Sequence, residues 1–305
     1  MGGGLGGGGL AQAQVDGGQR VGRALARGPP KNGLTRLLQG ARLPPMPNRS
    51  IGFVTPKPWH PDLLGEYPGQ VSYLELGSPP TRMELCWCPP ALQEQLPGFW
   101  LAKHLVTQRQ WQTVMENNPS RRGQGPTHPV DSVSWDDARE FCKRAGLRLP
   151  SDKEWELACR AGTTMDFAVG GGKGLNAQMA NFDGNHPGGS GRDAFPWLYR
   201  GRTLPAGAFP PNAWGLHDMH GEHFEWCEDA AGDDGGERVL RGGGWITYGV
   251  HAVFAIRFRD APAFRFDIIG FRPCPSSIQS KPEAASKLRS GPRSEAGDER
   301  NDGAA

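Results

Sequence analysis

The stretch NAWGLHDMHGEHFEW at residues 212–226 carries a strong fold signal. Gly215 and Gly221 interrupt it, which disfavours a helix, while its tryptophan and phenylalanine side chains favour burial. The stretch therefore predicts an irregular, turn-rich backbone that packs into an aromatic core. Three further segments accompany it along the chain: RLPSDKEWELAC at 148–159, RVLRGGGW at 238–245 and GFR at 270–272.

Three helix starts lie upstream of this stretch, each marked by its capping residue: Thr107 with Gln110, Ser134, and Ser151 with Glu154. After about residue 165 the helical periodicity disappears, and short apolar segments alternate with glycine-rich turns. The pattern predicts an α+β fold that is rich in coil, with few helices and short antiparallel strands.

The composition along the chain predicts four segments. Residues 1–50 are rich in glycine and poor in aromatic residues, so we expect a disordered N-terminal segment. Residues 51–80 hold apolar side chains among prolines and are predicted to be an extended arm packed on the domain. Residues 81–275 form a single domain of ordinary size. Residues 276–305 contain no aromatic residue and are predicted to be a disordered, solvated tail.

Overall composition excludes several classes of protein. The 305 residues include 45 glycines and 28 prolines, which favours a loop-rich fold over a helical bundle. The net charge is +2, whereas a dedicated nucleic-acid binder usually has a larger excess of positive charge. No membrane-spanning run and no secretory signal are visible, so we expect no membrane span and, by default, a cytoplasmic location. Six cysteines are too few for a disulfide scaffold.

In their order, the four quoted segments resemble the formylglycine-generating, sulfatase-modifying enzyme family. The likeness covers about residues 95–275 and implies a C-type-lectin-like fold of the formylglycine-generating-enzyme type. Function is a separate question, because one fold hosts many activities.

The resemblance also places the catalytic cysteine pair of that family, at the second and seventh positions beyond the tryptophan of the Arg-Gly-Gly-x-Trp motif. Here these positions hold Thr247 and Ala252. A hydroxyl and a methyl group cannot bind copper as thiolates do, and no other cysteine occurs between Cys227 and Cys274. Related iron-dependent sulfoxide synthases use histidines of an additional helical domain that these residues do not contain. We therefore expect a protein that is not an enzyme and requires no cofactor; the alternative is an oxidoreductase of either type with altered catalytic residues.

The segment from Trp245 to Arg272 resembles the variable region of target proteins of diversity-generating retroelements built on the same fold. Rewriting the adenines of an AAC codon cannot produce Lys, Glu, Gln, Met or Trp, and residues 246–275 contain none of these. The resemblance predicts a ligand-binding face within 246–268, diversified by a retroelement, whose partner is a macromolecule, in particular a protein, and not a nucleic acid. Its predicted ligand-binding residues are Ile246, Thr247, Tyr248, His251, Phe254, Ile256, Phe258, Phe264, Phe266, Asp267 and Ile268. The alternative, that individual members are ordinary core residues, stays open.

The resemblance further implies two calcium sites. One consists of Asn181, the Phe182 carbonyl, Asp193 and the Phe195 carbonyl; the other consists of Asp218, the carbonyls of Gly221 and His223, and Glu225. The alternative is that these carboxylates cap turns or pair with arginines.

A histidine triplet and a cysteine pair are weaker indications of metal binding or of a disulfide. His217, His220 and His223 recur every third residue, but the flanking glycines disfavour the helix that would gather them around zinc. By resemblance, Cys159 and Cys274 correspond to a pair that is bridged in some relatives, so we expect them to lie close together.

Overall fold

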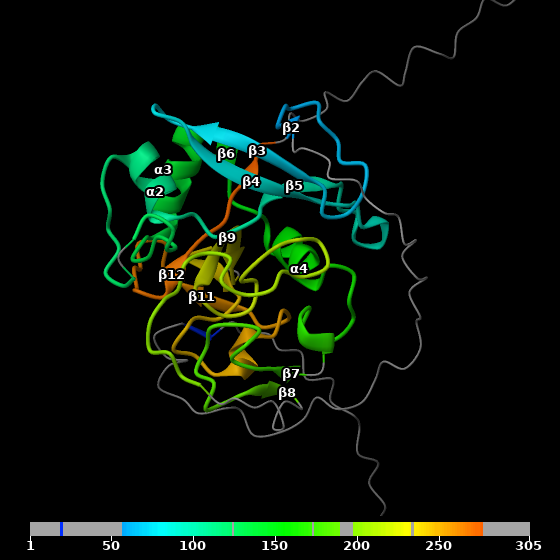
Figure 1. The fold of residues 1–305 in the computed structure, drawn as a ribbon, viewed down its shortest axis with the longest axis vertical. Coiled ribbons are helices and arrows are strands. Elements are labelled where there is room, and N and C mark those ends of the chain that lie inside the picture. The colour runs from blue at the N-terminus through cyan, green and yellow to red at the C-terminus, as the bar shows by residue number, and fades with distance from the viewer. Residues whose placement is uncertain are drawn as a thin grey trace, which may run out of the picture.

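In the computed structural model, the described residues are 19–20, 57–123, 125–172, 174–189, 198–232 and 235–276. The predicted disordered segments 1–50 and 276–305 lie outside these ranges, apart from Gln19, Arg20 and Ser276. A four-stranded sheet and two helices lie at one end of the domain, and irregular loops form the other end (Figure 1). Among the described residues, no helix has the length and apolar character needed to cross a membrane.

The four-stranded sheet has the order β2-β3-β4-β5 and consists of β2 (Lys57–Pro58), β3 (Val71–Leu76), β4 (Thr81–Cys88) and β5 (Phe99–Ala102). β3 pairs antiparallel with β4 along its whole length. Residues 71–76 are therefore part of the sheet rather than of an arm packed on it, and the domain begins before residue 81. Because prolines flank β3, this strand could not be recognised from the sequence.

Three α-helices follow, and each begins with the capping box that local sequence favours. They are α2 (Gln108–Met115), α3 (Trp135–Ala145) and α4 (Asp152–Arg160). In each box the cap side chain accepts a hydrogen bond from the backbone three residues on, and that residue's side chain accepts one from the cap N–H. The three predicted helix starts are confirmed.

The second sheet has the order β1-β11-β10-β9-β12. Its strands are β1 (Gln19–Arg20), β11 (Phe258–Asp260), β10 (Glu237–Arg241), β9 (Phe224–Ala231) and β12 (Ile269–Gly270). β10 is antiparallel to both neighbours, and β12 is parallel to β9. Short elements complete the fold: β6 (Leu147–Arg148) with β13 (Cys274–Pro275), β7 (Gly174–Leu175) with β8 (Gly188–Gly189), and the 3-10 turns Leu92–Glu94, Gly170–Gly172 and Gly249–Ala252.

All four segments quoted from the sequence meet in buried contacts. Trp155 Nε1 donates to Glu225 Oε2 at 2.8 Å, and Arg272 donates Nε and Nη2 to the two oxygens of the same carboxylate at 2.7 and 2.8 Å. Arg241, also buried, pairs with Asp152 at the start of α4. These ion pairs lie inside an aromatic core, so the motifs hold the coil-rich half of the chain against the helices. The fold is α+β and C-type-lectin-like, as the resemblance implied.

The six cysteines are all free and buried. Burial raises the pKa of Cys86 to about 12, and it also raises the pKa of Cys159 and of Cys274. Cys159 and Cys274 belong to the same apolar cluster but form no disulfide.

Candidate functional site

The two positions that hold cysteines in the enzymes of the resembled family are buried and have structural roles. Thr247 Oγ1 accepts a hydrogen bond from the Gly244 N–H at 3.0 Å and donates to the Gly244 carbonyl at 2.8 Å. The Ala252 carbonyl accepts from His220 Nδ1 at 2.7 Å. The other ring nitrogen, Nε2, accepts from the Ala168 N–H at 3.0 Å, which fixes the tautomer. Neither position offers a side chain that could bind copper.

Five of the predicted ligand-binding residues lie in the interior, so the expectation that they face a ligand is wrong. Phe258 belongs to β11 and packs edge-on against Phe224, with ring centroids 4.7 Å apart. Ile268 packs so closely on Gly244 that a Cβ there would lie 3.1 Å from its own Cβ. A coil without periodicity gives no signal for which residues turn inward. The five buried residues are Thr247, His251, Phe254, Phe258 and Ile268.

The other six predicted residues are partly exposed: Ile246, Tyr248, Ile256, Phe264, Phe266 and Asp267. Phe264 and Phe266 lie nearly parallel with centroids 6.2 Å apart, and the Tyr248 ring stacks on His186 at 4.0 Å. These side chains retain the accessibility that a binding surface needs.

Residues outside 246–268 complete this surface. Arg122 pairs with Asp267 at 2.6 Å, and its guanidinium lies 5.8 Å from the Trp245 ring centroid. Tyr199 lies nearly parallel to Trp245, with centroids 6.4 Å apart. Sequence reasoning missed Arg122 and Tyr199 because they come from distant coil segments and match no motif, whereas Trp245 belongs to the quoted 238–245 segment. We call the set the variable face: Arg122, His186, Tyr199, Tyr248, Phe264, Phe266 and Asp267. The Trp245 ring lies behind this face and is buried, with 4% of its surface exposed.

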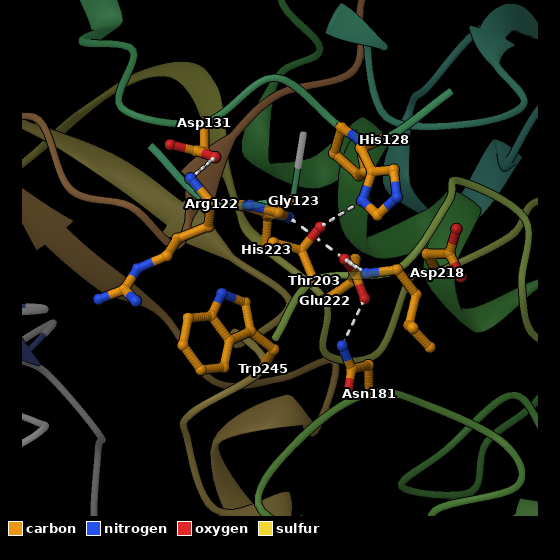
Figure 2. Close-up of polar contacts among 12 residues, drawn as sticks. Arg122, Gly123, His128, Asp131, Asn181, Thr203, Asp218, Glu222, His223 and Trp245 are labelled. Atoms are coloured by element: carbon orange, nitrogen blue, oxygen red, sulfur yellow. Dashed lines mark hydrogen bonds and ion pairs between the residues drawn. The ribbon is translucent and has the colours of Figure 1, made fainter. Parts of the chain in front are cut away.

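Beneath the variable face lies a buried polar cluster (Figure 2). The Glu222 carboxylate accepts hydrogen bonds from Asn181 Nδ2 at 2.7 Å and from the Leu204 N–H at 2.9 Å, yet burial raises its pKa to about 8. Burial lowers the pKa of His223 to about 3, and its Nδ1 lies 3.8 Å from Glu222 Oε1. Both ring nitrogens of His223 lack hydrogen-bond partners among the described residues. The cluster is sealed from solvent and supports the face rather than forming part of it.

In the second calcium set one carboxylate is already engaged, whereas Asp218 Oδ1 is buried and has no partner among the described residues, which suits a calcium ligand. Arg272 and Trp155 occupy both oxygens of Glu225, so this carboxylate already has its positive partner. One Asp218 oxygen accepts from the Gly207 N–H at 2.7 Å. The alternative reading of the sequence, an arginine pair, holds for Glu225.

The first calcium set can be tested only in part. Asn181 Oδ1 is buried and without a partner within the described ranges, which suits a calcium ligand, and Phe182 is buried beside it. Asp193 and Phe195 lie outside the described residues.

Two of the three histidines of the 212–226 stretch engage separate partners, whereas the ring nitrogens of His223 have none among the described residues. His217 Nδ1 donates to the Phe209 carbonyl at 2.8 Å and its ring packs on His104, whereas His220 contacts Cys159 Sγ at 3.7 Å. In the part of the chain that the structure describes, no group of three or more His, Cys, Asp or Glu side chains could hold a metal ion.

Comparison with known proteins agrees with this fold. Residues 67–275 match the sulfatase-modifying factor enzyme 1-like domain. The formylglycine-generating enzyme of Bos taurus is 36% identical over 154 residues, which cover 45% of this chain and 39% of the relative. A Bos taurus protein named inactive C-alpha-formylglycine-generating enzyme 2 is 35% identical over 164 residues, 50% of this chain and 52% of the relative. The chain thus spans about half the length of these relatives or less.

Among solved structures, Treponema denticola variable protein 1 superposes with a TM-score of 0.54 at 21% identity, over 68% of this chain and 99% of that one. This likeness shows the shared fold. The match to the domain over most of the chain shows the family: the chain belongs to the sulfatase-modifying factor, or formylglycine-generating enzyme, family.

Proposed function

We propose that this chain is a non-enzymatic ligand-binding protein whose variable segment, residues 246–268, is diversified by a retroelement. One observation carries the proposal. At the two positions where enzymes of the family are expected to hold their cysteine pair, Thr247 closes a turn and Ala252 is buried. The fold remains intact around these positions, so the scaffold is kept while the thiol chemistry is lost.

The relatives are compatible with this division between fold and activity. One curated relative is named inactive, and a solved structure of the same fold is named a variable protein. Proteins with this fold therefore include some that are not named as active formylglycine-generating enzymes. The fold alone is thus no reason to assign that oxidation to this chain.

Recognition would depend on a rigid support and an exposed set of side chains. The buried Glu225–Arg272 pair and the aromatic core hold the segment from behind. In front, Tyr248, Phe264 and Phe266 supply contact area at little cost in conformational entropy. The partner is a macromolecule, in particular a protein, because an extended aromatic surface exceeds what a small polar metabolite contacts. This recognition needs no cofactor.

The proposal is tested by incubating the purified chain with copper and a cysteine-containing sulfatase peptide, beside an active formylglycine-generating enzyme as the positive control. We expect no aldehyde product by mass spectrometry, because Thr247 and Ala252 provide no thiolate. Aldehyde formation above background would favour the oxidoreductase alternative. A template repeat and a reverse-transcriptase gene beside the coding sequence would independently support diversification, and their absence would count against it.

A further inference from the structure

Arginine side chains lie outermost at and beside the variable segment, and the carboxylates that pair with them lie deeper. In the Arg122–Asp267 pair the arginine side chain is 54% exposed and the aspartate 17%. In the Arg265–Asp137 pair the exposed fractions are 51% and 27%. A ligand that approaches this surface meets guanidinium groups first, so the outward electrostatic potential favours negative charge.

The two pairs differ in how many donors they leave free. Arg265 donates both Nε and Nη2 to the Asp137 carboxylate, each at 2.7 Å, which is a filled bidentate fork. Arg122 donates only Nε to Asp267, at 2.6 Å, and within the described ranges no other side chain accepts from its guanidinium. Because a guanidinium carries five N–H donors, Arg122 can still bind a second carboxylate.

Two further arginines lie near Arg122. Arg121 and Arg202 are exposed, and no carboxylate among the described residues lies within ion-pair distance of either. Thr203 Oγ1 lies 3.1 Å from His128 Nδ1, which brings the backbone of the neighbouring Arg202 close to that ring. A Cβ at Gly123 would lie 2.5 Å from His128 Nδ1, so the loop that follows Arg122 packs on the same ring. The three arginines thus gather around one loop.

An exposed aromatic ring, backed by a buried one, adjoins these charges. Figure 2 shows the Arg122 guanidinium and the Trp245 ring extending away from the buried Glu222–Asn181 contact. Tyr199, 43% exposed, lies nearly parallel to the buried Trp245 ring and supplies the aromatic surface that a ligand can reach. A ligand with carboxylates next to apolar or peptide groups could contact the arginines and the exposed aromatic ring at the same time.

From this arrangement we propose that the variable face binds an acidic polypeptide, and that Arg122, which lies outside the variable segment, is the residue that receives a ligand carboxylate. The inference rests on the proposed function and deepens it by naming the class of partner. Asp267 occupies one edge of the guanidinium and competes with the ligand. A polypeptide is favoured over a nucleic acid because the cations are few and local, while the chain as a whole has a net charge of only +2.

The test is the fluorescence anisotropy of a labelled octaglutamate peptide titrated with the full chain at low salt. We expect binding that weakens with added salt, a loss of about fivefold in Arg122→Gln, and a gain of about threefold in Asp267→Asn, which removes the competitor. Arg122→Lys keeps the charge without the fork and should lie between wild type and Arg122→Gln. The matched control is Arg82→Gln in β4, outside the variable face. Arg82 is equally exposed and also donates only Nε to one carboxylate, that of Glu75, so the affinity of this variant should equal that of wild type.

Several results would overturn the inference: no binding of octaglutamate, equal losses in Arg122→Gln and Arg82→Gln, or equally tight binding of octalysine. Tighter binding of an eight-nucleotide single-stranded DNA with the same dependence on Arg122 would replace the polypeptide by a nucleic acid. Thermal unfolding of each variant shows that the protein remains folded. Aldehyde formation in the copper assay would defeat the proposed function; loss of octaglutamate binding without aldehyde formation would defeat only the inference.

Discussion

Phe258, Phe264 and Phe266 carry the same side chain within one short segment but occupy different environments. Phe258 is a residue of β11, and its ring is fully enclosed where it packs on Phe224 of β9. Phe264 and Phe266, in contrast, stack on each other and contact the core on one side. The sequence predicts all three as ligand-facing because the surrounding coil has no period that separates inward from outward positions. Long-range packing, not local preference, decides which ring is buried.

These environments predict unequal mutational costs. Phe258→Ala should lower the free energy of unfolding by about 3–5 kcal/mol, because it leaves a cavity in a closed part of the core. Phe266→Ser should cost less, about 1–2 kcal/mol, since its ring is only partly buried where it packs on the core. Urea denaturation of the two variants compares them directly. Equal costs would mean that Phe266 belongs to the core and not to the variable face.

The buried Glu225–Arg272 pair gives a second residue-scale prediction. Arg272→Met should cost about 3–5 kcal/mol in unfolding free energy, because the Glu225 carboxylate is then left without its cation in the interior. Adding Glu225→Gln to this variant should recover part of the loss, since no charge remains buried. Chemical denaturation of the single and double variants measures the coupling; additive losses would argue against it.

At the scale of elements, the helices could be predicted and one strand could not. Capping residues are local signals, and all three predicted ones start a helix. The strand β3 had no comparable signal: prolines flank it, and its pairing with β4 is visible only in the folded chain. The same reason explains why Arg122 and Tyr199 were missing from the predicted site, since their contacts with 245–267 join segments far apart in sequence.

The cap of α4 gives a prediction at this scale. Ser151 Oγ accepts from the Glu154 N–H at 3.2 Å, and the Glu154 carboxylate accepts from the Ser151 N–H at 2.7 Å. Ser151→Ala should therefore cost about 1 kcal/mol of stability, whereas Ser151→Asp, which keeps an acceptor at the cap, should cost much less. Thermal unfolding separates the two variants. Identical midpoints for alanine and aspartate would show that the cap contributes little.

For the whole molecule, buried histidines link stability to pH. Burial lowers the pKa of His104 to about 3, with the neighbouring His217 adding to the effect, and it lowers the pKa of His220 to about 4. A lowered folded-state pKa means that the unfolded chain takes up protons first. The stability from these neutral rings is complete above pH 6.5 and is lost as the pH falls toward 3–4.

We therefore expect stability to decline between pH 6.5 and pH 4.5, by up to about 1.4 kcal/mol per pH unit for each such histidine. His104→Phe keeps the ring that packs beside His217 and removes one proton site, so its decline should be shallower by that amount. Urea denaturation at pH 7.5, 6.0 and 5.0 gives the slopes. A variant slope as steep as that of wild type would show that His104 is not one of the responsible groups.

The complete burial of the six native thiols has a practical consequence for identifying the partner. Maleimides and other alkylating reagents attack exposed thiolates, and these cysteines are enclosed, with the pKa of Cys86, for example, raised to about 12. A cysteine introduced at the exposed Arg265 position, beside the variable face, would then be the single reactive thiol of the folded protein. A photocrosslinker or an environment-sensitive dye could be attached there without removing any native cysteine, so that the undisturbed scaffold reports where its ligand docks.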